Sequence, residues 1–146
     1  MIKLTQQMSD LIGRAPSDGL HCLLVTAVPD AWPQPTLKGS LRVLDDQHLC
    51  YWERSLKNTF ESLRANPRVT VYYRNNDLKD ELPKGAGWRF YGLASVHQSG
   101  AERDRILPIM PKNEIDKDPD LKGAAILIKV ASITDLLGNV LQEDGA

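Results

Sequence analysis

The sequence predicts an α+β fold, mainly β, in which an antiparallel sheet of six strands curls into a barrel with flanking helices. The first observation is the order of the predicted elements: helix, three strands, helix, two strands, helix and strand. A doubly wound parallel sheet would need a helix between successive strands, and this order does not supply one. The second observation is that hairpin-sized connections join the early strands, which is typical of an antiparallel barrel.

The first predicted helix spans residues 3–13. Its apolar side chains recur at the spacing of one helical face, and Gly13 followed by Pro16 ends the pattern. The first strand covers residues 21–28, a continuous apolar and β-branched run bounded by turn-forming residues. We expect this strand to be buried, with the helix packed over the core.

Residues 36–44 are predicted to form one strand, because apolar and polar side chains alternate there with a period of two. The apolar side carries Leu37, Leu41 and Val43, and the polar side carries Lys38, Ser40 and Arg42. After a short turn, residues 48–53 return as the hairpin partner of this strand.

The second half of the chain adds two helices and three strands. A helix follows Ser55 as N-cap and stops before Pro67, and strands are predicted at residues 68–74, 88–97 and 123–137. Residues 75–87 form a charged loop. Ser99 and Glu102 have the spacing of a capping box, so the last helix is predicted to begin near residue 100 and to fail around Pro108.

Length and charge limit the classes of function. With 146 residues, the chain is expected to form a single domain over 1–146. Its 18 basic and 19 acidic residues give a net charge of −1, which removes the electrostatic drive for nucleic-acid binding. No apolar run approaches a membrane span and the first fifteen residues lack the apolar core of a signal peptide, so we expect a cytoplasmic protein without a membrane partner.

The cysteines and histidines do not predict a metal site. Cys22 and Cys50 lie inside apolar segments without CxxC spacing, which favours buried reduced thiols. His21, His48 and His97 are scattered, so no pair shares a helical face in the way metal ligands do. We assign no role to His21 or His97.

Basic and polar residues gather where the helix after Ser55 begins. The sequence places Arg54, Lys57, Asn58 and Thr59 around the unpaired amides of its first turn. Cations oppose the helix dipole there, at a cost of about 0.3–1 kcal/mol each when exposed, and a bound anion such as a phosphate would explain them. The alternative is that Arg54 and Lys57 only cover the surface or pair with nearby glutamates, Glu53 and Glu61.

The segment "PTLKGSLRVLDDQHLCYWERSLKNTFESLRANPRVTVYYRN", followed by "WRFYGLASVH", resembles the FMN-binding split-barrel family related to pyridoxamine 5′-phosphate oxidase. The similarity covers about residues 15–100 and is most specific in "SLRANPRVTVYYR" and "RFYGLA". It implies a six-stranded antiparallel split β-barrel that works as a homodimer, with FMN at the subunit interface. It also implies an FMN-dependent oxidoreductase acting on a small molecule that the sequence does not identify.

The resemblance also implies which residues contact the cofactor. The flavin ring would lie against two strands, at Lys38, Gly39 and Ser40 and at Trp52 and Glu53, and Lys38 and Arg42 could face its N1/C2 side. The phosphate would meet Arg54, Ser55, Lys57, Asn58 and Thr59. Trp88 would cover the flavin of the partner subunit or, alternatively, lie in the core; for Arg42 an exposed barrel face is the preferred interpretation.

Two features depart from the family pattern. The family commonly has Thr or Ser where this chain has Glu53, and a carboxylate repels a phosphate, so Glu53 is expected to face Arg54 or solvent. Counted back from Pro67, the family's phosphate lysine falls nearer Asn58 or Thr59 than Lys57.

No catalytic residue is assigned, since hydride transfer occurs at the flavin. A flavin-binding protein without turnover and a relative that uses F420 or haem remain the alternatives.

Overall fold

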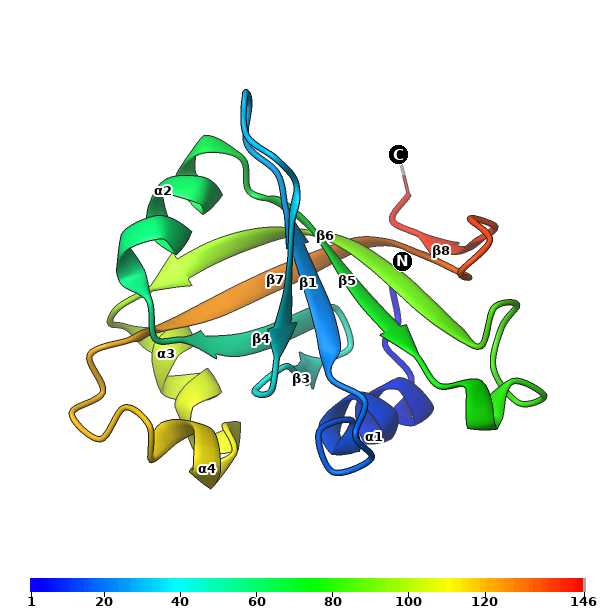
Figure 1. Ribbon diagram of the computed structural model, residues 1–146, viewed down its shortest axis with the longest axis horizontal. Helices are drawn as coiled ribbons and strands as arrows, with labels where there is room; N and C mark the ends of the chain where they lie inside the picture. Colours follow the sequence, from blue (N-terminus) through cyan, green and yellow to red (C-terminus); the bar gives the residue numbers. More distant parts are fainter. Residues whose placement is uncertain (146) are drawn as a thin grey trace.

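A single antiparallel sheet of eight strands curls into a half-barrel, with helices at its ends (Figure 1). The structure is a computed structural model that describes residues 1–145, and the side chains of Lys57 and Asn58 lie outside the described residues. The strands are β1 (Cys22–Thr26), β2 (Gln34–Lys38), β3 (Arg42–Asp45), β4 (His48–Glu53), β5 (Arg68–Arg74), β6 (Gly87–His97), β7 (Ala124–Thr134) and β8 (Val140–Glu143). The helices are α1 (Gln6–Arg14), α2 (Leu56–Ala65), α3 (Ala101–Ile106) and α4 (Lys112–Ile115), with 3₁₀ turns at Asn76–Leu78 and Leu107–Ile109.

The connection between β2 and β3 forces the sheet to curl. The strand order is β2-β1-β5-β6-β7-β4-β3, with β8 paired to β7, so β2 and β3 lie at opposite edges. In a flat sheet those edges would be about 29 Å apart, at about 4.8 Å per strand. Residues 39–41 join them, and the four Cα–Cα steps from Lys38 to Arg42 reach at most about 14 Å. The two edges therefore meet, and we call the line where they meet the seam.

Ser40 fastens the seam. Its hydroxyl accepts a hydrogen bond from the backbone N–H of Trp52 at 3.0 Å and lies 3.4 Å from the Trp52 carbonyl oxygen, to which it can donate. Ser40 is 3% exposed, so these bonds are shielded from water. The link joins the turn after β2 to β4, which lies at the other side of the sheet.

The prediction of one strand over residues 36–44 is wrong in its bounds. A turn at Gly39 and Ser40 divides this segment into β2, which pairs with β1, and β3, which pairs with β4. The turn also breaks the predicted alternation, because Leu37 is 62% exposed whereas Leu41 is 1% exposed. Leu37 and Leu41 therefore do not share an apolar face.

Most other elements follow the prediction. The α+β class and the curled antiparallel sheet are confirmed, although the sheet has eight strands and not six. Strands 48–53 and 68–74 have the predicted bounds. The predicted strand 123–137 ends earlier, as β7, and a turn then leads to β8. The capping box at Ser99 is not formed, because Gly100 is the N-cap of α3 and makes no side-chain capping bond.

The core fills the inside of the curled sheet. It is built mainly from β1, β4, β5, β6 and β7 together with α1, and a smaller cluster lies under α3.

Cys22 and Cys50 are buried and free, as predicted, and burial raises the pKa of each thiol to about 12. Among residues 1–145, no helix is long and apolar enough to cross a membrane.

Gly92, in the "RFYGLA" strand, tests the packing of the sheet. It lies where β6 shifts register against β7, and a Cβ there would be 2.6 Å from the Lys129 carbonyl oxygen and 2.7 Å from Ile128 Cγ2. We expect Gly92→Ala to lower the free energy of unfolding by about 1–3 kcal/mol in urea titrations, because backbone must move.

Gly13→Ala is the matched control. Gly13 lies in α1, and its added Cβ would meet only Arg42 Cδ, at 3.9 Å. This substitution is expected to raise the free energy of unfolding by up to about 1 kcal/mol, because alanine favours helix. Equal effects at the two glycines would contradict the packing described for β6 and β7.

Candidate functional site

The seam contains a hollow of about 330 Å³, which we call the seam pocket. Two separate stretches of the predicted site meet there: the end of β2, and the end of β4 with the residues that follow it before α2. The lining residues are Leu37, Lys38, Gly39, Trp52, Glu53, Arg54, Ser55 and Glu114. Six of these eight were singled out from the sequence, and α4 contributes the Glu114 side chain that the sequence did not indicate.

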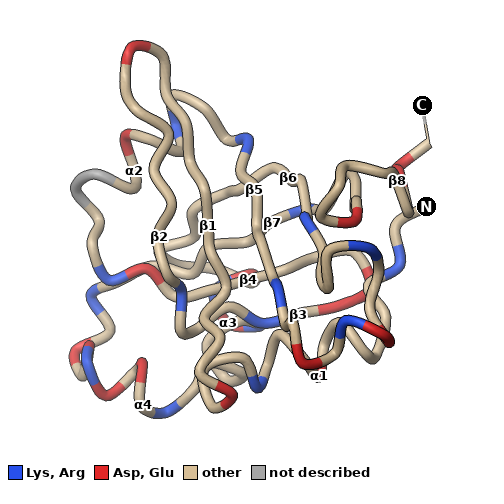
Figure 2. The backbone as a smooth tube through the Cα atoms, turned by 45° about the vertical axis from the view of Figure 1, so that its right-hand side comes forward, with Lys and Arg blue, Asp and Glu red and all other residues tan. Residues whose placement is uncertain are grey.

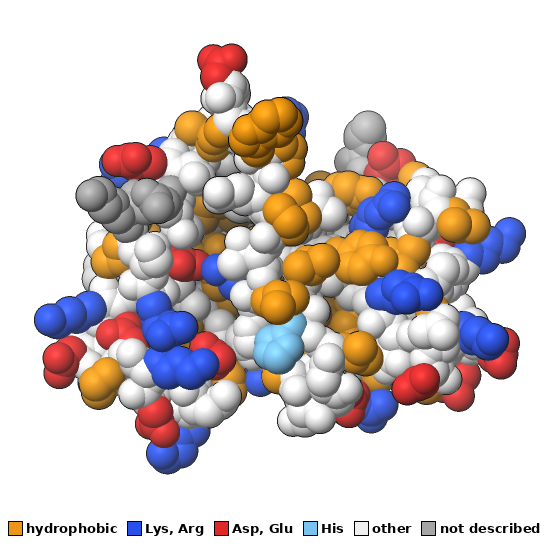
Figure 3. All heavy atoms as spheres, in the orientation of Figure 1, with side chains coloured by type: hydrophobic (Ala, Val, Ile, Leu, Met, Phe, Trp, Pro, Cys, Tyr) orange, Lys and Arg blue, Asp and Glu red, His pale blue; other side chains and the backbone are white. Residues whose placement is uncertain are grey.

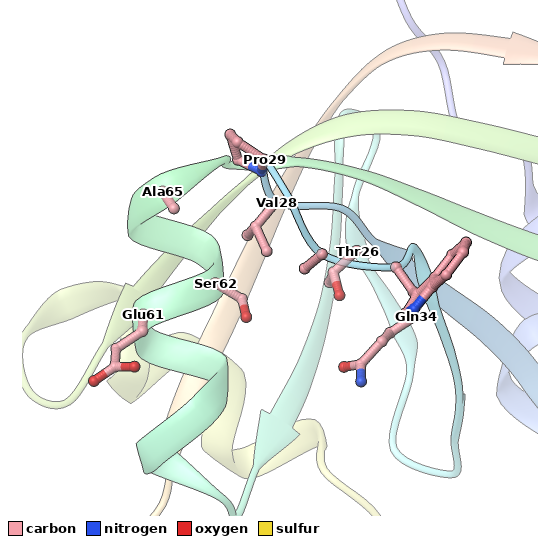
Figure 4. A pocket seen from close by; sticks show the side chains of 9 residues that line it. Thr26, Val28, Pro29, Gln34, Glu61, Ser62 and Ala65 are labelled. Atoms are coloured by element: carbon pink, nitrogen blue, oxygen red, sulfur yellow. The ribbon is translucent and has the colours of Figure 1, made fainter.

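Two further hollows continue from the seam pocket between the β1–β2 hairpin and α2. A small inner pocket of about 60 Å³ shares Lys38 and Glu53 with the seam pocket; its other lining residues are Leu24, Thr26, Gln34, Thr36, Tyr51, Thr59 and Ser62. A hairpin pocket of about 600 Å³ shares Thr26, Gln34 and Ser62 with the inner pocket and is shown in Figure 4. The three hollows therefore form one series along α2.

A buried ion pair separates the seam pocket from the inner pocket. Lys38 Nζ lies 2.8 Å from Glu53 Oε2, and the two side chains are 16% and 7% exposed. Lys38 Nζ also lies 5.0 Å from the centre of the Tyr51 ring, a cation–π contact. The expectation that Glu53 faces Arg54 or solvent is wrong, because the curled sheet brings the ends of β2 and β4 together.

The second oxygen of Glu53 lies at the start of α2. Glu53 Oε1 accepts a hydrogen bond of 3.2 Å from the backbone N–H of Ser55. Ser55 is the N-cap residue of α2, as predicted, but its hydroxyl makes no capping bond to the helix. The predicted capping by this hydroxyl is therefore wrong, and the exposed side chain of Ser55 lines the seam pocket instead.

Tyr51 is a site residue that the sequence analysis missed. It lines the inner pocket, and its buried hydroxyl has no hydrogen-bond partner among the described residues. Burial, together with the nearby charge of Glu53, raises the pKa of this hydroxyl well above its usual value. Residues 51 and 53 of one strand point to the same face, so the alternation in β4 could have linked Tyr51 to Glu53.

Trp52 is held by the loop after α4. Its indole N–H donates to Asp118 Oδ2 at 2.9 Å, and the Arg103 guanidinium lies 5.2 Å from the centre of its ring system. Asp118 also accepts bonds from the amides of Lys122 and Gly123. Desolvation acts to raise the pKa of Asp118, but these three hydrogen bonds outweigh it and hold the pKa below its usual value.

The remaining predicted residues lie in different places. Thr59 lines the inner pocket, and Ser40 is buried under the seam. Trp88 is 2% exposed and packs between Tyr73 and Phe90 in the core, away from the lining of the three hollows. Lys57 and Asn58 were predicted to meet the phosphate, but their side chains lie outside the described residues.

Arg42 differs from the exposed barrel position preferred for it. It is half-buried, and its guanidinium donates to the carbonyl oxygens of Leu41 at 2.6 Å and Gly39 at 3.3 Å. These bonds hold the turn between β2 and β3. Arg42 therefore supports the backbone beneath the seam pocket.

Charges in the seam pocket balance among its described side chains. Two cations, Lys38 and Arg54, stand against two carboxylates, Glu53 and Glu114. Glu114 is 17% exposed and pairs with Lys117 at 3.3 Å, and α4 holds it close above Gly39. No group of three or more potential metal ligands occurs within the described part of the chain.

Asp118 offers a test of how Trp52 is fixed. We expect Asp118→Asn to lower the free energy of unfolding at pH 7 by about 1–3 kcal/mol, because the three hydrogen bonds lose their charged acceptor. The depressed pKa of Asp118 means that its stabilisation is present above the unfolded pKa, near 4, and is lost as the pH falls below it. The variant should therefore lose less stability than the wild type between pH 5 and 3 in urea titrations, and the exposed neighbour change Asp120→Asn serves as control.

Comparisons with known proteins locate this fold among solved structures. No family model matches the chain, and no curated protein matches it by sequence. Group A Streptococcus HupZ has 22% identity and a TM-score of 0.68, with 97% of this chain and 99% of that chain covered. A putative pyridoxamine 5′-phosphate oxidase from Lactobacillus delbrueckii has 20% identity and a TM-score of 0.64, with coverage of 91% and 94%.

An FMN-binding protein from Syntrophomonas wolfei has 17% identity and a TM-score of 0.64, with 90% of this chain and 87% of that chain covered. The TM-scores of 0.64–0.68 show a shared fold over nearly the whole chain, and at 17–22% identity the matches show the fold alone. The likeness agrees with the resemblance seen in the sequence segments around the seam. The chain therefore has the split-barrel fold of the pyridoxamine 5′-phosphate oxidase-like and FMN-binding proteins.

Proposed function

We propose that this protein binds FMN along the series of hollows beside α2 and works as an FMN-dependent oxidoreductase in the cytoplasm. One observation carries the proposal. Six residues that the family resemblance assigns to the flavin come from two separate stretches of the chain, 38–39 and 52–55, and the fold brings them around one hollow. The same fold occurs in a protein described as FMN-binding.

The groups that line the seam pocket suit a flavin nucleotide. Arg54 and the Ser55 hydroxyl, both exposed at the start of α2, would hold the phosphate. Lys38 would donate to a carbonyl or hydroxyl group of the ligand, and the Tyr51 hydroxyl could gain its missing partner in the inner pocket. When bound, the flavin itself supplies hydride-transfer chemistry.

The chain's own residues position and tune the ligand. Glu53 fixes the Lys38 ammonium at the boundary of the two pockets, so its positive charge has one defined location. Positive charge beside a flavin ring favours the reduced, anionic ring. Asp118 and Arg103 hold the Trp52 ring beneath the seam pocket from two sides. The site would therefore be largely formed before the ligand enters.

A homodimer is part of the same proposal. β2 is an edge strand with exposed side chains, and Leu37 on β2 and Trp32 before it are 62% and 89% exposed. Hydrophobic side chains also gather over the centre of the face in Figure 3. A second copy of the chain would cover this edge and these side chains.

Lys and Arg are interspersed with Asp and Glu along the described backbone, including the region around α4 (Figure 2). The near-zero net charge of −1 agrees with this distribution. A small molecule therefore fits the site better than a polyanion.

The absorption spectrum of the purified protein tests the proposal. Flavin bands that are lost on addition of NADH or NADPH and return with an acceptor would support the oxidoreductase. Flavin bands that no donor reduces would favour a binding protein without turnover. A Soret band would indicate haem, and a protein that binds F420 but not FMN would also contradict the proposal.

Arg54→Ala tests where the phosphate lies. Because exposed charges contribute about 0.2–1 kcal/mol, we expect FMN affinity to fall about twofold to fivefold while riboflavin affinity changes less. Flavin fluorescence titrations would measure both dissociation constants. Arg64→Ala, in the last turn of the same helix, is the control and should leave both constants unchanged. Equal losses for FMN and riboflavin would place the phosphate elsewhere.

The dimer has a separate test. Light scattering after size-exclusion chromatography should give about twice the chain mass of 16.3 kDa. Leu37→Glu should shift the protein toward the monomer, because it places a charge on the exposed edge strand without changing the core. A monomeric wild-type protein at micromolar concentration would rule out this part of the proposal.

A further inference from the structure

We propose that Glu53 sets the charge selectivity of the seam pocket and makes it nearly indifferent to a ligand's terminal phosphate. The inference rests on the proposed function, because it takes a flavin as the ligand. It concerns a residue at which this chain departs from the family pattern. The expected consequence is that riboflavin and FMN bind with similar affinity.

Glu53 is fixed beside the start of α2. Glu53 is 6% exposed, and both of its oxygens are engaged: Oε2 with Lys38 and Oε1 with the backbone N–H of Ser55. The carboxylate therefore already lies at the entrance to α2, where the positive end of a helix would attract an anion. A phosphate approaching this entrance meets a fixed negative charge.

The charge of Lys38 in the seam pocket is already balanced by Glu53. Glu53 neutralises Lys38 at 2.8 Å, so the buried cation closest to the ligand is matched before any ligand binds. Glu114, from α4, adds a second carboxylate to the lining, and it is paired with Lys117. Of the described cations lining the pocket, Arg54 is the one at the exposed end. A dianion would therefore have Arg54 as its counter-charge among the described lining residues, beside a Lys38 that Glu53 already neutralises.

The hydrogen-bonding groups around Lys38 and Glu53 suit a neutral hydroxyl. A neutral hydroxyl can donate to a carboxylate oxygen and accept from the Lys38 ammonium or from a hydroxyl such as that of Ser55. A phosphate dianion can only accept. The mixed donor and acceptor set around Lys38 and Glu53 therefore suits the hydroxyl-bearing part of a flavin and leaves the phosphate, among the described lining residues, with Arg54 and the Ser55 hydroxyl.

Glu53→Gln is the primary test. Glutamine keeps the size and one acceptor oxygen, which can still accept from the Ser55 N–H, while it removes the charge and releases Lys38 to meet an anion. The quantity measured is the ratio of the riboflavin to the FMN dissociation constant, from fluorescence titrations of the full chain. We expect a ratio below about tenfold in the wild type and an increase of about tenfold in Glu53→Gln, because like-charge repulsion is removed.

Two further variants control for misfolding and for the general effect of removing a carboxylate. Glu53→Thr introduces the residue type common in the family and should raise the ratio in the same direction if Glu53→Gln does not fold, as judged by circular dichroism. Glu81→Gln removes an exposed carboxylate that lines none of the three hollows, so its ratio should stay at the wild-type value. Lys57 is present in every variant, so its contribution cancels from the comparison.

The outcomes separate this inference from the proposed function. A ratio that rises at least threefold in a folded Glu53 variant, but not in Glu81→Gln, supports the inference. A wild-type ratio above tenfold, or a rise smaller than threefold in the folded Glu53 variants, overturns it and leaves flavin binding intact. If neither flavin binds the wild type or any variant, the proposed function fails and the inference fails with it.

Discussion

The meeting of the two sheet edges at residues 39–41 is the constraint on which the rest of the structure depends. A connection this short cannot bridge a flat seven-strand sheet, so the sheet must curl until β2 lies beside β4. The curl creates the enclosed core, and the Ser40 hydroxyl binds the backbone of Trp52 where the edges meet. The site residues are neighbours for the same reason that the barrel closes.

The Lys38–Glu53 pair at this seam is a weak source of stability, since desolvating two charges can cost as much as their attraction returns. Its effect is on geometry. The pair ties the last residue of β2 to the last residue of β4, and Glu53 also accepts the amide of Ser55 before α2 begins. One carboxylate thus fixes the relative position of two strand ends and a helix start, which belong to the two stretches, 37–39 and 52–55, that form most of the seam pocket.

Local sequence patterns were enough to predict strands and helices, but they did not show which residues from distant parts of the chain contact one another. The bounds of β4 and β5 follow from β-branched and aromatic runs that end at turn residues. The division of residues 36–44 was missed because the alternation continues through Gly39, although a glycine inside a strand pattern is itself a sign of a break. Glu53 was assigned to Arg54 or solvent because sequence order shows its neighbours, whereas its partner Lys38 is fifteen residues away and is reached only through the curl.

The same limit explains what the sequence could say about the start of α2. Basic residues there oppose the helix dipole, and the sequence left open whether a bound anion or nearby glutamates offset them. The structure places one such carboxylate, Glu53, against the Ser55 amide, so part of the offset comes from the chain itself. This intramolecular anion does not exclude a ligand phosphate, because Arg54 and the Ser55 side chain remain exposed on the pocket wall. It does mean that a phosphate would enter a site in which Glu53 already neutralises Lys38, the nearest buried cation. The strength with which an anion is held therefore depends on the balance of charge around Glu53, and not on the number of basic residues in the turn.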